Sequence, residues 1–137
     1  MWGDFIGVVL NGKYGFIDKT GKQVIPCVYD YVYSIEREFA KVRLNDKYGF
    51  INKAGQLIVP CNYDEVYYGY SDELIKVVFG KYDDPNRKYG LFDKTGKTII
   101  PCYCDEIDRF ENGLARVKIA GKWMGYIDET GTQYWED

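Results

Sequence analysis

The stretch that decides the fold is KYGFIDKTGKQVIPC at residues 13–27. It returns without gaps as KYGFINKAGQLIVPC at 47–61 and as KYGLFDKTGKTIIPC at 88–102. A fourth, altered copy, KWMGYIDETGTQYW at 122–135, has one extra residue before its Gly and lacks the Pro-Cys pair. The first Gly of each copy stands at position 15, 49, 90 or 125, so successive copies are 34, 41 and 35 residues apart. A period of this size is the signature of a repeat protein in which each copy forms one supersecondary unit.

Each copy is preceded by a strand segment, and apolar and basic residues alternate in residues 40–44 and 115–119. Ile6, Val8 and Leu10 occupy the same apolar places before the first copy. Such alternation is typical of a strand with one buried face. The dipeptide Asn11-Gly12 between two strand segments predicts a two-residue type I′ turn. A second tight turn is expected at Thr20-Gly21, and Pro26 is expected to end the third strand because proline has no N–H to donate. Each unit is therefore predicted to be a three-stranded antiparallel meander.

The predicted fold class is all-β, with four three-stranded antiparallel meander repeats stacked as an open curved array in a single domain. The units are expected at about residues 5–38, 39–73, 74–113 and 114–137. Segments such as residues 63–66 are interpreted as connectors between units, and residues 80–87 as a lengthened hairpin loop. The open form is favoured over a small closed β-propeller-like ring, because the chain begins at a first strand and ends at a third, so no unit is shared between the termini.

Composition excludes several functional classes. The net charge of −3 gives no basic surface for a phosphate backbone, so a nucleic-acid partner is not expected. The sequence has no His, which removes the usual base for a Ser or Cys nucleophile. The start has no signal-peptide pattern, and no run of about 18 apolar residues occurs. We therefore expect a soluble protein without membrane insertion, cytoplasmic if Met1 is the native start.

The repeated pattern resembles the WG, or KWG, repeat family of bacterial proteins. The resemblance rests on the Lys-Tyr/Trp-Gly hairpin, the Ile-Pro after it, and the Phe-x-x-Gly-Leu-Ala-x-Val motif, here residues 110–117. It covers nearly the whole chain, and it implies an all-β repeat fold with an interaction role and no catalytic residues to transfer. The family's Trp is Tyr in three copies. In the fourth copy Met124 separates Trp123 from its Gly, which predicts a β-bulge or register shift there.

The cysteines and the repeated acids are interpreted as structural. Equivalent positions of a repeat lie one unit apart, farther than a disulfide or a tetrahedral thiolate site permits. Cys27, Cys61, Cys102 and Cys104 are therefore expected to be small buried side chains, with Cys104 at the core position of Tyr29. The repeated acids are expected to cap turns, because a single active site requires asymmetry that a repeat lacks. These residues are Asp18, Asn52, Asp93 and Asp128 before the second turn, and Asp30, Asp64 and Asp105 after the third strand. No metal site and no cofactor is predicted.

Aromatic and basic side chains provide the candidates for a ligand site. The column formed by Tyr14, Tyr48, Tyr89 and Trp123 is expected to be repeat core, as are its neighbours Phe16, Phe50, Leu91 and Tyr126. Tyrosines outside the consensus are better candidates, because Tyr tolerates partial exposure with a hydrated hydroxyl. These tyrosines are Tyr31, Tyr33, Tyr67, Tyr68 and Tyr70. The alternating bases should line one sheet face, where they either contact an acidic partner or form a solvated face that prevents edge-to-edge aggregation. These bases are Lys41, Arg43, Lys76, Arg116 and Lys118.

The predicted function is a non-catalytic binding module that recognises a protein or peptide partner through these tyrosines and bases. Two alternatives remain open, namely carbohydrate or cell-envelope binding and a toxin-neutralising, immunity-type role. A carboxylate-based hydrolase is the least favoured hypothesis, because the sequence shows no pair of non-repeated acids that would face each other across a cleft.

Overall fold

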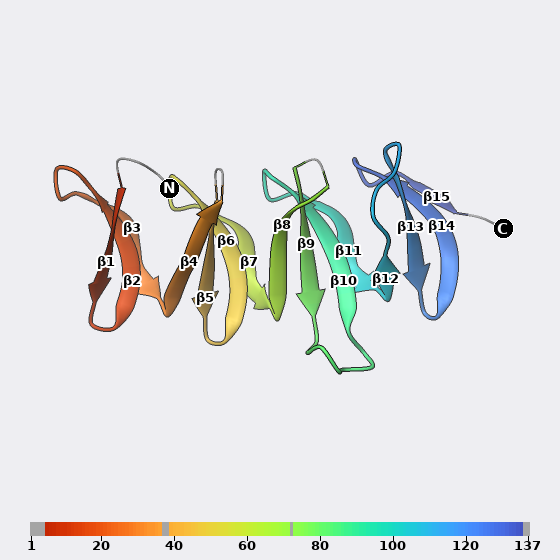
Figure 1. Ribbon diagram of the computed structural model, residues 1–137, viewed down its shortest axis with the longest axis horizontal. Helices are drawn as coiled ribbons and strands as arrows, with labels where there is room; N and C mark the ends of the chain where they lie inside the picture. The colour runs from red at the N-terminus through yellow and green to blue at the C-terminus, as the bar shows by residue number, and fades with distance from the viewer. Residues whose placement is uncertain (1–4, 37–38, 72, 136–137) are drawn as a thin grey trace. The chain divides into compact units, whose positions relative to one another are not determined.

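The computed structural model describes residues 5–36, 39–71 and 73–135, and for residues 34–36 it describes the backbone alone (Figure 1). Met1, on which the expected localisation rests, lies outside these ranges. The chain divides into two compact units: unit 1 extends to Tyr63 and unit 2 begins at Asp64. Among the described residues, no helical segment has the length and apolarity that crossing a bilayer requires.

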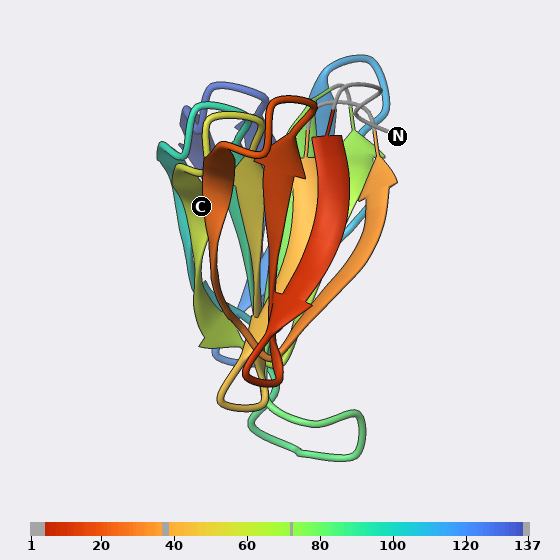
Figure 2. The same cartoon turned by 90° about the vertical axis from the view of Figure 1, so that its left-hand side faces the viewer.

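Unit 1 contains two antiparallel sheets, with the strand orders β1-β2-β3 and β4-β5-β6-β7. Their strands are β1 (Phe5–Leu10), β2 (Lys13–Asp18), β3 (Gln23–Tyr29), β4 (Tyr31–Glu36), β5 (Phe39–Leu44), β6 (Lys47–Asn52) and β7 (Leu57–Tyr63). The turns Asn11-Gly12 and Asn45-Asp46 lie at the same end of this unit (Figure 2). Their four residues have φ values of 53°, 77°, 54° and 65°, which confirms the predicted positive-φ turn at Asn11-Gly12.

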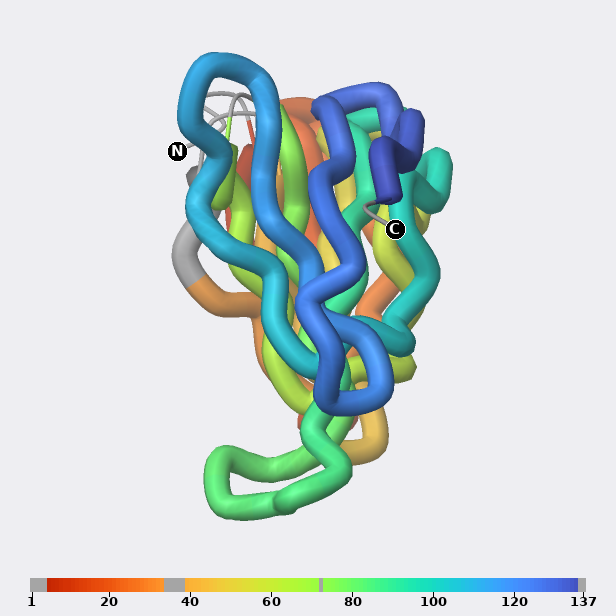
Figure 3. Tube along the Cα trace, turned by 90° about the vertical axis from the view of Figure 1, so that its right-hand side faces the viewer, coloured from red at the N-terminus to blue at the C-terminus, as the bar shows by residue number. Residues whose placement is uncertain are grey.

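Unit 2 also contains two antiparallel sheets, with the orders β11-β10-β9-β8 and β12-β13-β14-β15. Their strands are β8 (Glu65–Ser71), β9 (Leu74–Phe79), β10 (Lys88–Asp93), β11 (Thr98–Cys104), β12 (Glu106–Ile107), β13 (Leu114–Ile119), β14 (Lys122–Asp128) and β15 (Gln133–Trp135). The lengthened loop, residues 80–87, extends beyond the β13–β14 turn of the same unit (Figure 3). Val117 pairs with Gly125 while Lys118 pairs with Trp123, so Met124 is left out of the pairing and the predicted register shift is confirmed.

The all-β class and the antiparallel meanders are confirmed, and three of the four sheets in the described part of the chain have one strand more than predicted. The expected end of the third strand at Pro26 was wrong: β3 continues to Tyr29, and Pro26 falls in the register shift between the pairs Phe16–Ile25 and Tyr14–Tyr29. The additional strands β4, β8 and β12 arise from segments interpreted as connectors; for example, Val66 pairs with Val77 of the next hairpin. This pairing satisfies backbone N–H and C=O groups that an irregular connector would leave without partners. Each strand order is linear, so no sheet described here closes on itself.

The core of each unit lies between its two sheets. In unit 1 the contacting buried side chains are Phe16, Ile25 and Tyr29 on one sheet and Ala40, Val42 and Ile51 on the other. In unit 2 they are Leu74, Leu91, Ile100 and Cys104 on one sheet and Ile107, Ala115, Val117 and Ile127 on the other. Cys104 is fully buried, as expected for the counterpart of Tyr29. Burial of these side chains is the main force that holds neighbouring repeats together.

The Gly of the hairpin in the first three copies is required by a close approach of backbone. A Cβ on Gly15 would lie 2.4 Å from the carbonyl oxygen of Ile25, and a Cβ on Gly49 would lie 2.3 Å from that of Val59. Both distances are far shorter than van der Waals contact, so only glycine fits where the third strand bends over the second. The recurring Lys-aromatic-Gly motif is thus a requirement of the scaffold.

Candidate functional site

The repeated acids hold the turns of the scaffold. Asp18 accepts a hydrogen bond from the backbone N–H of Thr20 at 2.9 Å. Asp105 accepts one from the N–H of Gly121 at 2.6 Å and also pairs with Lys88. These contacts confirm the predicted structural role. The hydrogen bond from Lys88 keeps the pKa of Asp105 below its ordinary value, so this carboxylate is ionised at neutral pH and has no proton to give as a general acid.

The cysteines are free thiols, with Cys104 buried and the others half-buried. Burial raises the pKa of Cys61 to about 11 and that of Cys104 to about 12, so both stay protonated at neutral pH. A protonated thiol is a weak nucleophile and a weak metal ligand. Within the described ranges, no group of three or more His, Cys, Asp or Glu side chains is arranged to hold a metal ion.

Unit 1 gathers two of the predicted tyrosines into a continuous cluster. The ring centroids of Tyr14 and Tyr31 are 4.9 Å apart, those of Tyr31 and Tyr33 are 4.7 Å apart, and those of Tyr33 and Tyr48 are 5.6 Å apart. Lys41 Nζ lies 4.6 Å from the ring centroid of Tyr48 and 5.7 Å from that of Tyr33. A hydrogen bond with Tyr48 raises the pKa of Tyr33. The predicted base and the predicted tyrosines therefore form one cation–π arrangement.

Unit 2 repeats this arrangement around a different lysine. Lys76 Nζ lies 4.8 Å from the ring centroid of Tyr70 and 4.4 Å from that of Tyr89. Burial, followed by the positive charge of Arg87, lowers the pKa of Lys76. Tyr67 pairs with Lys76 across the strands and is 47% exposed. The column aromatics Tyr14, Tyr48, Tyr89 and Trp123 are only half-buried; Tyr89 packs against the core of unit 2 and also contacts Lys76.

The other predicted site residues are distributed more widely. Tyr68 pairs with Ile75 and therefore faces the side of the sheet opposite to Tyr67. The Tyr70 hydroxyl donates a hydrogen bond to the carbonyl oxygen of Asp108 at 2.7 Å, and burial raises the pKa of Tyr70 to about 12. This hydroxyl thus links the two sheets of unit 2.

The remaining bases also lie beside aromatic side chains. Arg43 pairs with Tyr31 on one side and with Tyr48 on the other. The guanidinium carbon of Arg116 is 4.2 Å from the Trp123 ring centroid, and Lys118 Nζ is 5.8 Å from it. The predicted basic stripe is therefore a set of separate pairs of a base with an aromatic ring.

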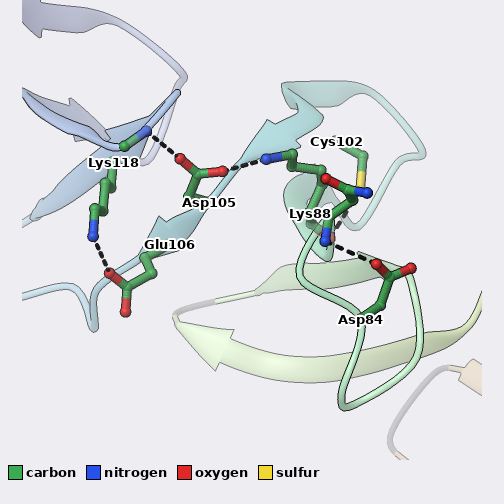
Figure 4. A network of polar contacts seen from close by, with 8 residues as sticks. Asp84, Lys88, Cys102, Asp105, Glu106 and Lys118 are labelled. Atoms are coloured by element: carbon green, nitrogen blue, oxygen red, sulfur yellow. Dashed lines mark hydrogen bonds and ion pairs between the residues drawn. The ribbon is translucent and has the colours of Figure 1, made fainter.

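A pocket of about 500 Å³ lies beside the lengthened loop of unit 2, and we call it the loop pocket. It is lined by Asp84, Pro85, Arg87, Tyr89, Asp105, Glu106, Lys118 and Gly121. Figure 4 shows that two of its acids are already paired: Asp105 with Lys88, and Glu106 with Lys118 at 3.6 Å. Internal hydrogen bonds order the loop itself, including one from the N–H of Arg87 to the carbonyl oxygen of Asp84 at 3.1 Å.

Arg87 is the side chain of the loop pocket with unused hydrogen-bonding capacity. Its guanidinium carbon lies 5.5 Å from the ring centroid of Tyr82 and 5.6 Å from that of Tyr89. Among the described residues, its Nε is buried and has no hydrogen-bond partner. A buried N–H donor normally has an acceptor. The pocket is therefore suited to an anionic group that approaches the guanidinium between the two rings.

The sequence pattern indicated the lengthened loop but did not place Arg87, Tyr89 and Lys118 in one pocket. The available signal was asymmetry: residues 80–87 have no counterpart in the other copies. The position of Arg87 over Tyr89 depends on the folded path of this loop, which the repeat pattern does not specify.

Comparison with known proteins agrees with the repeat observed in the structure. No curated protein and no solved structure matches the chain. The family model described as WG containing repeat matches residues 14–48, 48–82 and 89–123, which together are more than half of the chain. Each match runs between two column aromatics or ends in the lengthened loop, in register with the hairpins described above. The chain therefore belongs to the family of WG-repeat proteins.

Proposed function

We propose that this protein is a non-catalytic repeat module that binds an acidic segment of a protein or peptide partner at the loop pocket. The observation that carries the proposal is the Arg87 guanidinium, whose buried Nε has no acceptor among the described residues and whose carbon lies 5.5 Å and 5.6 Å from the ring centroids of Tyr82 and Tyr89. Arginine in such a setting binds carboxylates with two parallel hydrogen bonds and contributes contact area through its flat face.

Further features of unit 2 support a peptide ligand. Lys76 places a second positive charge near Arg87, close enough that Arg87 contributes to the lowered pKa of Lys76. Tyr82 is 92% exposed and Tyr67 is 47% exposed, so aromatic area is available beside the charges. Tyrosine and arginine are the residue types enriched where protein partners bind most strongly.

The test uses fluorescein-labelled hexaglutamate as the probe and fluorescence anisotropy as the readout. Arg87→Gln is expected to weaken binding by about tenfold, because a charge-assisted hydrogen bond contributes about 1.5–3 kcal/mol. Arg87→Lys should recover only part of the affinity, since lysine retains the charge but not the flat bidentate group. Arg109→Gln is the matched control, because Arg109 is an exposed arginine of unit 2 that does not line the loop pocket.

Two results would overturn the proposal. One is hexaglutamate binding that is equally weakened by the Arg87 and Arg109 substitutions, which would show a general charge effect. The other is the absence of acidic-peptide binding together with binding of neutral oligosaccharides on a glycan array, which would favour the carbohydrate alternative.

A further inference from the structure

The first sheet of the chain exposes an apolar face. Phe16 and Ile25 point into the core of unit 1, so the residues one step away along the strands face the opposite side. The residues of this first apolar face are Ile6, Val8, Leu10 and Ile17. Ile6 is 50% exposed and Leu10 is 61% exposed. Lys13, the cross-strand partner of Leu10, is a charged residue on the same side of the sheet, and it forms an ion pair with Asp30.

At the positions of Ile6 and Val8 this face is buried in every other described repeat, whereas Phe79, the counterpart of Leu10, is 54% exposed. The pairing of each first strand with the hairpin Gly aligns Val8 with Val42, Val77 and Val117, each of which is 0% exposed. The counterparts of Ile6 are Ala40, Ile75 and Ala115, which are 0%, 0% and 1% exposed. Burial of these positions is thus the rule of the repeat, and the first sheet departs from it.

Within each unit, the structure shows which residues cover this face. In unit 1 it is covered by the opposite face of the preceding sheet, through Phe16 and Ile25. In unit 2 it is covered in the same way, through Leu91 and Ile100. The first apolar face is therefore complementary to the side of another WG repeat that is equivalent to the Phe16–Ile25 side.

The last sheet carries that matching face without a cover. Leu114 is 39% exposed and Tyr126 is 36% exposed. Their counterparts are buried: Phe39 and Phe50 are 2% and 4% exposed in unit 1, and Leu74 and Leu91 are 3% and 0% exposed in unit 2. Leu114 and Tyr126 also border a hollow of about 570 Å³, whose other lining residues are the polar or charged Asp108, Arg109, Glu111, Asn112 and Arg116.

We propose that the first apolar face of one chain binds the Leu114–Tyr126 face of a second copy, head to tail. The two surfaces are the two halves of the interface that neighbouring repeats already form within each unit. Both faces leave apolar area without a cover, and exposed apolar area of this kind is a site of association. A contact between unlike faces leaves one free face of each kind on the dimer, so association continues beyond two copies.

The test is sedimentation velocity over a range of protein concentrations. The weight-average mass of the wild-type chain is expected to rise with concentration and to pass twice the mass of one chain. Ile6→Glu alters the first face, and Tyr126→Glu alters the last face. Each variant alone is expected to stay monomeric where the wild type associates, with affinity reduced by about tenfold or more because a charge would be buried in an apolar contact.

Mixing the two variants tests the head-to-tail arrangement directly. Each variant keeps one intact face, so an equimolar mixture is expected to form a dimer and to stop there. Tyr103→Glu is the control, because Tyr103 is 43% exposed and lies in β11, outside both faces; it should leave association unchanged. Unaltered circular dichroism of all three variants establishes that they fold.

The contrary outcomes are distinct. Wild-type protein that stays monomeric at all concentrations would overturn the proposal. A Tyr126→Glu variant that dimerises alone would show that the first face binds itself, and a mixture that remains monomeric would also rule out the pairing of unlike faces.

Discussion

In both units a lysine lies against tyrosine rings, Lys41 in unit 1 and Lys76 in unit 2, and we call this cation–π contact the lysine clamp. The two units differ in the residues that surround the clamp. In unit 1, Lys41 lies 4.6 Å from the Tyr48 ring centroid beside the two-residue turn Asn45-Asp46. In unit 2, Lys76 lies 4.4 Å from the Tyr89 ring centroid, and the lengthened loop adds Arg87 to the same ring. The clamp is common to both units and therefore belongs to the scaffold. The lengthened loop occurs in one copy only, and it forms the loop pocket.

The two cores differ at the repeat position of Tyr29, besides the position that Phe16 fills in unit 1 and Leu91 fills in unit 2. Tyr29 is 7% exposed in unit 1, and Cys104, which fills the same position in unit 2, is 0% exposed. The smaller side chain in unit 2 is accompanied by Tyr70 and Phe110, which pack against that core at 6.4 Å from each other. The smaller volume of Cys104 compared with Tyr29 is thus accompanied in unit 2 by the packing of Tyr70 and Phe110 against the core.

The largest expected effect concerns what the two units share. Gly49→Ala in unit 1 and Gly90→Ala in unit 2 would each place a Cβ within 3 Å of backbone atoms of the next strand, at 2.3 Å and 2.8 Å. Each substitution should lower the free energy of unfolding by at least about 3 kcal/mol, because backbone cannot move aside as a flexible side chain can. Urea denaturation followed by circular dichroism measures this loss.

Gly7→Ala is the control for this pair, since its nearest neighbour would be a Phe16 side-chain atom at an ordinary 3.6 Å. A loss at Gly7 as large as that at Gly90 would contradict the explanation by close backbone approach.

The next effect separates the two cores. Tyr29→Cys gives unit 1 the side chain of unit 2 without the compensating aromatic neighbours, so it should destabilise the protein by about 2–3 kcal/mol through the cavity it leaves. Cys104→Ala removes only a sulfur atom and should lower the free energy of unfolding by about 1 kcal/mol. Urea titrations measure both losses of unfolding free energy. Equal losses from the two substitutions would contradict the view that the same repeat position is filled by a large side chain in unit 1 and by a small one in unit 2.

Local patterns made much of this fold predictable from sequence. The turn at Asn11-Gly12 and the register shift at Met124 depend on neighbouring residues alone, and both were correctly predicted. The strand β8 was mistaken for a connector, because its pairing partner β9 is supplied by the following hairpin.

The candidate site was less predictable for the same reason. Lys76 and Tyr70 were chosen by type and exposure pattern, yet each contacts a partner that the fold supplies: Tyr89 for the lysine and the carbonyl of Asp108 for the tyrosine. Arg87 meets Lys118 and Glu106 in one pocket through the conformation of an irregular loop. The repeat pattern describes only what the copies have in common. It therefore cannot predict contacts made by a loop that occurs in one copy.

A smaller effect concerns the turn before the third strand, where unit 1 has Asn52 and unit 2 has Asp93. Each side chain accepts two backbone N–H hydrogen bonds, including one at 3.0 Å from Gln56 in unit 1 and one at 3.0 Å from Lys97 in unit 2. Although burial opposes ionisation of Asp93, hydrogen bonds from Thr95 and from the turn backbone give it a net lowered pKa. Its stabilising contribution is therefore complete above the unfolded-state pKa of about 3.9 and is lost as the pH falls through the lower folded-state pKa.

Amide hydrogen exchange between pH 5 and pH 2, corrected for intrinsic rates, measures this difference. The Lys97 N–H should lose protection as the pH falls, while the Gln56 N–H keeps it, because an amide side chain does not titrate. Asp93→Asn should remove the pH dependence in unit 2. Parallel loss of protection at both amides in the wild type would assign the effect to global unfolding instead.

The smallest expected effect distinguishes the two clamps. Lys41→Met should reduce the free energy of unfolding by about 0.5 kcal/mol through the lost cation–π contact. Lys76→Met should be neutral or slightly stabilising at pH 7, because burial lowers the folded-state pKa of Lys76 and so destabilises its charged form. Since that pKa is below the unfolded-state value of about 10.4, wild-type stability relative to Lys76→Met should rise as the pH increases toward 10.4. Urea titrations at pH 7 and pH 10 measure the difference, and the tyrosines that titrate at alkaline pH are common to both proteins. A difference that does not change with pH would show that Lys76 keeps its charge at no cost, and the two clamps would then be equivalent.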